Sequence, residues 1–194
     1  MYDIGFVQAL DLALNKVTPL GLETVASSEL VGRVCGQDVI ASIDYPTADA
    51  SLKDGYAVVS DDVARAHVSS PVELKVTGFV GAGDPCSVTV ASGTAVRVLS
   101  GAVIPPGADA VLAEEFTEER GSCIHAVAHA EPGRNILARG TEITTGETLV
   151  RRGQVFNPAL VSLLVAGGLE EAQVFRRPLV GLLATGDEVL LPGM

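Results

Sequence analysis

With 194 residues and a formal net charge of -11, the chain is long enough to bury a sizeable core, but its charge argues against nucleic acid as a partner. No apolar run reaches the roughly 20 residues that a membrane span needs, and the N-terminus lacks the basic start of a signal peptide. We therefore expect a cytoplasmic protein with neither membrane nor nucleic acid as partner. The three cysteines are far apart and lack metal-ligand spacing, which favours reduced thiols over a zinc site or a disulfide.

The N-terminal segment has apolar residues at every third or fourth position. This spacing predicts an amphipathic helix over residues 3–17, with Asp3 as N-cap. Residues 25–43 mix helical and strand-like signals and precede the break that Tyr45–Pro46 imposes. We expect this stretch to connect two domains.

Short β-type runs dominate the middle of the chain. Glycine and proline turns separate them at the spacing expected of a small sandwich or barrel. The acidic segment 114–121 is interpreted as a hairpin tip, and a solvated turn is favoured over a cation site. The predicted strands cover residues 56–59, 73–76, 94–99, 110–113 and 123–127.

A second helix is predicted to begin at Asn157 and Pro158, because asparagine is a good N-cap and proline suits the first helical turn. Gly167–Gly168 would end this helix, and the N-terminal helix would be its packing partner. Its predicted buried face consists of Leu160, Val161, Leu163 and Leu164.

The last part of the sequence carries a continuous apolar run at residues 179–184, which is typical of a strand buried on both faces of a parallel sheet. Ligands bind beyond the carboxyl ends of such strands, where residues 185–188 follow. The sequence ends at Met194 before any covering helix. We interpret 178–194 as the first strand and loop of an α/β domain whose remainder is missing.

The predicted fold class is therefore α+β. Residues 1–48 and 130–177 would form a discontinuous, elongated domain of mixed structure. Residues 49–129 would form an inserted β domain, a sandwich or barrel, and residues 178–194 the truncated α/β domain.

The most informative motif places an acid, a glycine and a tyrosine directly before an apolar strand, at Asp54, Gly55 and Tyr56. We expect Gly55 to adopt a positive φ angle, so that the chain turns there, exposes Asp54 and returns Tyr56 to the interior. The alternative interpretation is an ordinary Asp-Gly turn without function.

Four segments in order along the chain resemble the signatures of one family. Residues 51–58, S-L-K-D-G-Y-A-V, resemble N-S-A-M-D-G-Y-A, and residues 97–111 resemble R-I-x-T-G-A-x-x-P-x-G-A-D-A-V. Residues 133–143 resemble G-x-N-I-R-x-x-G-E-D, and A-T-G-D-E at 184–188 is the fourth match. The chain thus resembles the molybdopterin molybdenumtransferase (MoeA) family, whose eukaryotic relative is gephyrin.

The resemblance implies a reaction, a cofactor and partners. Molybdate would be transferred onto the dithiolene of adenylylated molybdopterin with cleavage of the adenylate, assisted by a divalent cation such as Mg²⁺. Members of the family are elongated homodimers, so a homodimer is implied. We expect the present fragment to be inactive alone.

The resemblance also implies roles for particular residues, since such chemistry needs carboxylates for a hard cation and donors for oxyanions. The implied catalytic residues are Asp54, Glu188 and Ser100. The residues implied in binding the pterin substrate are Gly55, Gly101, Arg134, Arg139, Thr185 and Gly186. The implied metal ligands are Asp187, Glu188 and Glu142.

Several positions depart from the family pattern. Lys53 replaces methionine, Ala50 replaces asparagine, Leu137 replaces a common arginine, and Glu142 replaces aspartate. Losing the arginine weakens the expectation of phosphate binding; Lys53 either compensates for it in part or forms an ion pair with a neighbouring acid such as Asp54. The changed arginine and methionine positions favour an alternative function, a non-catalytic scaffold or interaction module of the gephyrin type. The intact motifs at residues 54–56 and 185–188 favour the enzyme.

Overall fold

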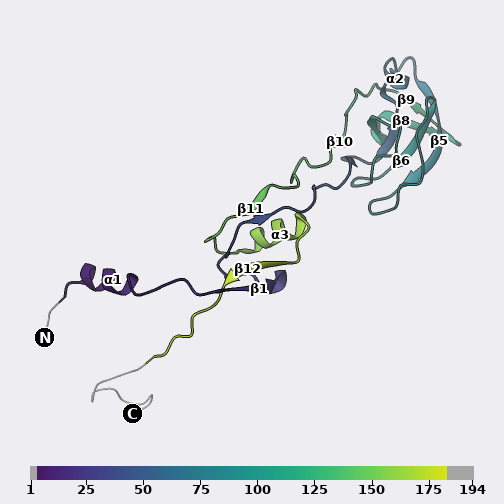
Figure 1. Ribbon diagram of the computed structural model, residues 1–194. Coiled ribbons are helices and arrows are strands. Elements are labelled where there is room, and N and C mark those ends of the chain that lie inside the picture. The colour runs from purple at the N-terminus through teal and green to yellow at the C-terminus, as the bar shows by residue number, and fades with distance from the viewer. Residues whose placement is uncertain (1–3, 183–194) are drawn as a thin grey trace, which may run out of the picture. The chain divides into compact units, whose positions relative to one another are not determined.

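Strands rich in valine and alanine pair into a six-stranded sheet in the computed structural model, which describes residues 4–182 (Figure 1). The chain divides into two compact units. One consists of Ile40–Thr148 with Ala166–Gly168, and the other of the chain up to Val39, Leu149–Val165 and the chain from Leu169 onward. Strands outnumber helices among the described residues, which confirms the α+β class.

The unit that begins at Ile40 contains the whole six-stranded sheet, which we call the β unit. All six strands fall between residues 55 and 126, inside the range 49–129 expected for an inserted β domain. The β unit extends further because β3 (Ala50–Ser51) pairs with β10 (Ile136–Leu137), which ties the later segment to it. The exact domain boundaries stay a prediction.

The strand order in the sheet is β7-β4-β6-β5-β9-β8, and every neighbouring pair is antiparallel except β5 with β6. The five predicted strands are confirmed, but the interpretation of residues 114–121 as a hairpin tip is wrong. A short 3-10 turn, η2 (Glu114–Phe116), leads into β8, which is an edge strand. Charged residues are common on edge strands. The acidic composition of this strand was therefore interpreted as a solvated turn. The strands are β4 (Gly55–Val58), β5 (Val72–Val80), β6 (Thr94–Val98), β7 (Ala110–Ala113), β8 (Thr117–Arg120) and β9 (Cys123–Ala126).

Both faces of this sheet are covered in its centre. Because successive side chains of a strand point to opposite faces, Tyr56 and Val58 of β4 join one buried cluster and Ala57 joins another. The first cluster also takes in Val63 of α2 (Ser60–Val63). All four residues of β4 are consequently buried, so the strand that follows Asp54 is fixed on both sides.

The sheet is strongly curled. The Tyr56 hydroxyl on β4 donates a hydrogen bond of 2.5 Å to Glu119 on β8, although β8 lies four positions from β4 in the strand order. Four inter-strand spacings in a flat sheet amount to about 19 Å, which no pair of side chains could bridge in this way. The β8 edge therefore returns over the start of the sheet.

Gly55 serves a different purpose from the one expected. Its backbone is extended at the start of β4 and is not among the residues with positive φ, so the predicted turn at Gly55 is wrong. It pairs with Val98 of β6 and Ala113 of β7. An added Cβ would lie 2.2 Å from the Leu112 carbonyl oxygen. Glycine is thus required by the close approach of β7.

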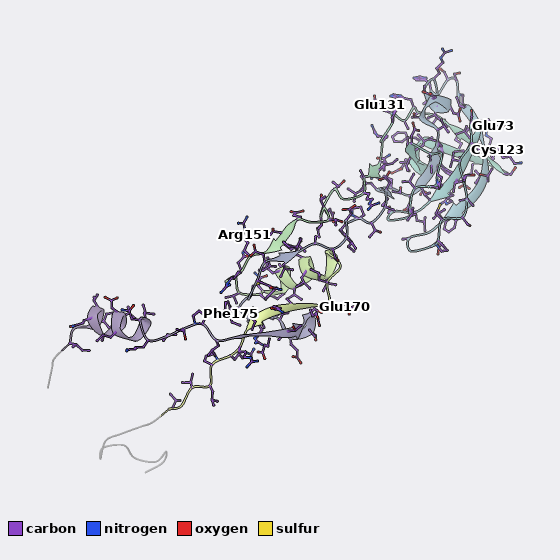
Figure 2. All side chains as sticks on the ribbon, viewed as in Figure 1. Glu73, Cys123, Glu131, Arg151, Glu170 and Phe175 are labelled. Carbon is purple, nitrogen blue, oxygen red and sulfur yellow. The ribbon has the colours of Figure 1, made fainter. Side chains whose placement is uncertain are left out.

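The other unit contains a two-stranded antiparallel sheet of β1 (Leu22–Ala26) and β12 (Glu171–Phe175). Figure 2 labels Glu170, which directly precedes β12, and Phe175, its last residue. The turn η1 (Ser27–Glu29) follows β1. A further short pair joins β2 (Val39–Ile40) to β11 (Thr148–Val150).

Helix α3 (Pro158–Ala166) begins as predicted. The Asn157 side-chain oxygen accepts a 2.9 Å hydrogen bond from the Leu160 backbone N–H, which confirms the N-cap. Leu164 is fully buried and the other three residues of the predicted face are half-buried. The chain leaves the helix through Gly168, whose φ is +85°.

The N-terminal helix α1 (Phe6–Leu14) is confirmed but shorter than predicted, and Gly5 is its N-cap; Asp3 lies outside the described residues. None of its side chains is buried, so the expected packing against α3 is wrong. Amphipathic spacing shows which face of a helix can be buried but not by what. No helix in the described part of the chain is long and apolar enough to cross a membrane.

The predicted strand at 179–184 is not formed in its described part. Leu179, Val180 and Leu182 are exposed and lie in no strand. A strand needs a partner for its backbone, and none of the described strands pairs with this run. Residues 183 and 184 lie outside the described residues.

Replacing Gly55 with alanine tests the close approach of β7. Because the new Cβ would meet the Leu112 carbonyl, Gly55→Ala should lower the free energy of unfolding of the β unit by about 1–3 kcal/mol. Gly21→Ala, in the other unit, is the control for a glycine replaced without a clash: nothing lies within 4 Å of its added Cβ, and we expect a change within about 0.5 kcal/mol. Urea denaturation followed by circular dichroism measures both; equal midpoints for the two variants would contradict this role of Gly55.

Candidate active site

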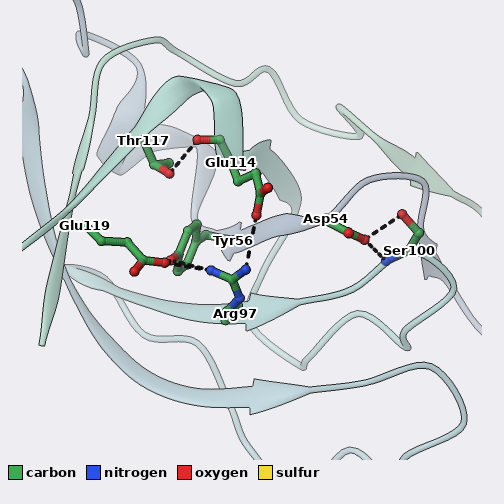
Figure 3. A network of polar contacts seen from close by, with 7 residues as sticks. All are labelled: Asp54, Tyr56, Arg97, Ser100, Glu114, Thr117 and Glu119. Carbon is green, nitrogen blue, oxygen red and sulfur yellow. Dashed lines mark hydrogen bonds and ion pairs between the residues drawn. The ribbon is translucent and has the colours of Figure 1, made fainter.

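Asp54 and Ser100 meet because of how β4 and β6 pair. Asp54 directly precedes β4, and Ser100 follows the end of β6 by two residues; the two strands run antiparallel, with Gly55 opposite Val98. Asp54 Oδ1 accepts a 2.7 Å hydrogen bond from the Ser100 backbone N–H and a 2.8 Å bond from its hydroxyl (Figure 3). Two residues with implied catalytic roles are thus in direct contact, while the roles stay predictions.

The carboxylate of Asp54 is exposed and is kept ionised. The backbone N–H of Ser100 is the main cause that holds the pKa of Asp54 below its usual range, followed by the Ser100 hydroxyl, and the charge of Arg97 adds to the effect. Oδ2 makes no hydrogen bond with any described residue, so it is open to a ligand. Ser100 therefore fixes Oδ1 of Asp54 and leaves Oδ2 accessible to a ligand.

The loop after Ser100 uses its amides internally. Gly101 has φ +83°, and its N–H donates a 2.7 Å hydrogen bond to the Ser51 carbonyl. The Ala102 N–H donates to the Leu99 carbonyl at 2.9 Å. Gly101 therefore supplies the left-handed conformation of the turn, and in this conformation its amide is not free for an anion. Its implied role in binding the pterin substrate stays a prediction.

A second polar group lies beside the first. It is centred on Arg97, the first residue of the second family signature, for which no role was predicted. Arg97 Nη1 donates to Glu119 at 2.6 Å and to the Tyr56 oxygen at 3.2 Å, and Nη2 donates to Glu114 at 3.1 Å (Figure 3). The guanidinium also lies 5.7 Å from the centre of the Tyr56 ring. Glu119 was missed because β8 was missed.

This network fixes the charge of Arg97 near Asp54. The hydrogen bond to Tyr56 is the main cause that raises the pKa of Arg97, and burial is the main cause that raises the pKa of Tyr56. Arg97 and Glu119 line a hollow of about 380 Å³ together with Glu114, Glu115 and Thr117. The hollow is rich in acceptors, and its one cation is already paired.

The implied metal ligands are not assembled among residues 4–182. These residues contain no group of three or more His, Cys, Asp or Glu side chains that could hold a metal ion. Glu142 is exposed, and its N–H donates to the Tyr45 carbonyl. Thr185, Gly186, Asp187 and Glu188 lie outside the described residues. The described side chains alone therefore do not fit a divalent cation.

Arg139 is held by two aspartates that the sequence did not single out. Its Nε donates to Asp44 at 2.7 Å, and its backbone N–H donates to Asp49 at 2.8 Å. The other oxygen of Asp44 accepts from the N–H and hydroxyl of Thr145, both at 2.8 Å. Arg139 thus has a structural partner, whatever it contributes to substrate binding.

Arg134 and Lys53 make no ion pair with any described residue. The expectation that Lys53 pairs with a neighbouring acid is wrong for the described part of the chain. The positive charge that lowers the pKa of Asp54 is that of Arg97. The three cysteines are all free, as predicted.

The ionisation of Asp54 can be tested directly. Its folded-state pKa lies below the unfolded value, so the carboxylate contributes stability above about pH 4 and the contribution is lost as the pH falls through the folded pKa. Ser100→Ala keeps the backbone donor and removes the hydroxyl, so it should raise the pKa of Asp54 only partway. Carboxyl ¹³C shifts followed by NMR measure this. Ser69→Ala, distant in the hydrogen-bond network, should not move it; an unchanged Asp54 pKa in Ser100→Ala would refute the assignment.

The sequence profile of the family described as MoeA N-terminal region (domain I and II) matches residues 4–168. Molybdopterin molybdenumtransferase of Staphylococcus aureus (strain MSSA476) is 34% identical over 183 residues, which cover 94% of this chain and 44% of that protein. Molybdopterin molybdenumtransferase 2 of Mycobacterium tuberculosis (strain ATCC 25618 / H37Rv) is 35% identical over 170 residues, 88% of this chain and 42% of that protein.

A solved structure agrees with these relatives. The crystal structure of a molybdopterin biosynthesis MoeA protein from Pyrococcus horikoshii superimposes with a TM-score of 0.81 at 33% identity, covering 90% of this chain and 45% of that one. The chain therefore spans less than half the length of the relatives it matches. Because sequence and fold agree over nearly all of the described residues, the chain belongs to the MoeA family and corresponds to its N-terminal region.

Proposed function

We propose that this chain is part of an enzyme of molybdenum cofactor biosynthesis that transfers molybdate onto adenylylated molybdopterin. The observation that carries the proposal is the Asp54–Ser100 pair, an exposed, ionised carboxylate with one oxygen fixed and the other open. The names of the relatives support the reaction class.

The geometry suits a carboxylate that acts on a bound substrate. A backbone N–H and a hydroxyl hold Oδ1, so the carboxylate cannot rotate freely, and Oδ2 can accept a proton or a hydrogen bond from a ligand. Asp54 is unprotonated at neutral pH, and the Ser100 backbone N–H, the Ser100 hydroxyl and the charge of Arg97 hold its pKa below the usual range. Ser100 is then a positioning residue, and Asp54 the group that contacts the substrate.

Several groups of the β unit that could donate to an adenylate are already engaged by other described residues. Arg139 is engaged by Asp44, Arg97 by two glutamates, and the Gly101 amide by Ser51. We propose that Thr185 and Gly186 contribute to pterin binding in the complete enzyme. Asp187, Glu188 and Glu142 would bind Mg²⁺, but the described residues form no cation site, so we assign the ion no step.

The chain also carries a large unpartnered apolar surface. Phe6, Val7, Leu10 and Leu14 of α1 are 45–81% exposed. Each would gain roughly 1.5–3 kcal/mol on full burial. We propose that α1 packs against a second copy of the chain, giving the homodimer that the family resemblance implies.

The scaffold function remains as an alternative. The leucine at position 137 and the paired state of Arg139 both reduce the positive charge offered to a phosphate, which favours a chain that organises other proteins rather than one that binds a nucleotide-linked pterin. Three free thiols are typical of a protein in a reducing compartment. We therefore propose that the protein is cytoplasmic, whichever of the two functions it has.

Complementation separates the two functions. The full reading frame that contains this sequence should restore molybdoenzyme activity in a strain lacking its molybdenumtransferase, and Asp54→Ala should reduce that activity by about 100-fold or more. Ser100→Thr, which keeps the hydroxyl, should retain it. The 194-residue chain alone should not complement.

The matched control is Asp61→Ala, because Asp61 is also an exposed acid of the β unit but its side chain makes no hydrogen bond with a described residue. Circular dichroism checks that each variant is folded. Full activity in a folded Asp54→Ala protein would remove Asp54 from catalysis, and failure of the unmodified reading frame to complement would favour the scaffold.

Light scattering at micromolar concentration tests the homodimer. The 20.0 kDa chain should give twice its mass. Leu10→Glu should convert it to a monomer, because a charge would be buried in the contact. Gln8→Glu, on the opposite side of α1, should leave the dimer intact. A monomeric unmodified chain would refute the proposal.

A further inference from the structure

A pocket of about 210 Å³ lies at the outer edge of β7 and shares no lining residue with the hollow beside Arg97. Its floor is formed by Val111–Ala113 of β7 and its walls by Phe116, residues 128–130, Arg134 and Asn135. We call it the β7 edge pocket. All of its residues belong to the β unit.

The lining of the β7 edge pocket is unusual for this chain. The protein has a net charge of -11, yet no carboxylate lines the pocket. Six of the nine lining residues are apolar, and the other three are Arg134, His129 and Asn135. The hollow beside Arg97, by contrast, has three glutamates. The pocket is therefore a local site where an anion escapes the repulsion of the acidic surface.

Arg134 is the cation available to such an anion. It is exposed and forms no ion pair with a described residue, whereas Arg97 and Arg139 are both paired. The family resemblance implies Arg134 in binding the pterin substrate, although its position in the signature G-x-N-I-R is a variable one. A guanidinium presents a planar fork of donors that fits a carboxylate in a bidentate manner.

Hydrogen bonds fix the backbone on one side of the pocket. The Val111 N–H donates to the Arg134 carbonyl at 2.9 Å, and Asn135 Nδ2 donates to the Val111 carbonyl at 2.8 Å. These bonds fix residues 134 and 135 along the β7 edge, with Asn135 at φ 57°. By the alternation of an antiparallel ladder, the Ala113 N–H faces the same edge, and no described residue outside the strand accepts it.

We propose that the β7 edge pocket binds a small organic monocarboxylate with an aromatic or branched apolar body. The carboxylate would be received by Arg134, with His129 as a second donor, and the apolar body would lie against β7 and Phe116. At about 30 Å³ per water-sized group, the volume holds on the order of seven such groups, close to the size of benzoate. The proposal rests on the lining of the pocket and not on the molybdenum chemistry proposed above, for which the family resemblance implies Arg134 in pterin binding.

A phosphate is a poorer match for the same pocket. Its two negative charges would face a single guanidinium, and it has no apolar part to cover a floor made of valine, leucine and alanine. The single charge of a monocarboxylate therefore matches the single guanidinium of Arg134, and its apolar body matches the apolar floor of the pocket.

Titration of the 194-residue chain with benzoate, followed by amide NMR shifts, tests the proposal. Shifts should concentrate at residues 111–116 and 128–135. Benzyl alcohol, which has the same ring without the charge, and inorganic phosphate should each bind at least about tenfold more weakly. Equal affinity for benzyl alcohol would overturn the anion site, and stronger binding of phosphate would overturn the carboxylate class.

Two variants separate the contributions of charge and shape. Arg134→Gln should weaken benzoate by about tenfold or more, because it removes charge-assisted hydrogen bonds, whereas Arg65→Gln, another exposed arginine of the β unit without an ion pair to a described residue, should not. Phe116→Ala should weaken benzoate while leaving the weak binding of acetate unchanged. Benzoate affinity unaffected by Arg134→Gln, or no binding at all to the folded chain, would refute the site.

Discussion

The β unit depends on a contact between strands that lie far apart in the sheet. The Tyr56 hydroxyl is buried with its ring, so it must find a hydrogen-bond partner inside the protein, because leaving a buried hydroxyl unpaired is costly. Glu119 supplies that partner from β8, and Arg97 neutralises the glutamate from β6. The contact requires the sheet to curl, and the curl encloses the cluster of apolar side chains to which Tyr56 belongs.

The same strand that is fixed by this contact positions the candidate active site. Tyr56 is two residues from Asp54, and Arg97 lies opposite Tyr56 in the register of β4 and β6. Gly55, between the two, lets β7 approach closely enough to bury β4 on both faces. Asp54 therefore projects from a rigid strand end, and Ser100 from the neighbouring strand end can hold one of its oxygens. Rigid support of this kind is what a catalytic carboxylate requires.

The turn η2 contributes to two hollows of opposite character. Glu114 and Glu115 belong to the acidic hollow beside Arg97, and Phe116 belongs to the β7 edge pocket, whose lining has no carboxylate. In an acidic chain the placement of each arginine decides where an anion can approach. Arg97 and Arg139 both form internal ion pairs. Arg134 forms none with a described residue, and it lines the β7 edge pocket, where its charge can act on a ligand.

The sequence by itself determined the family, the α+β class, five strands of the sheet and the cap of α3, because these depend on local spacing and on residues that are contiguous in the chain. It also assigned Asp54 and Ser100 to the same predicted catalytic site, from two motifs that are far apart in the sequence. Only the tertiary structure decided that Gly55 is needed for a close approach rather than a turn, that β8 exists, and that Arg97 rather than Lys53 acts on Asp54. Those facts depend on which strands become neighbours when the sheet curls, and side-chain contacts across non-sequential strands leave no pattern in a single sequence.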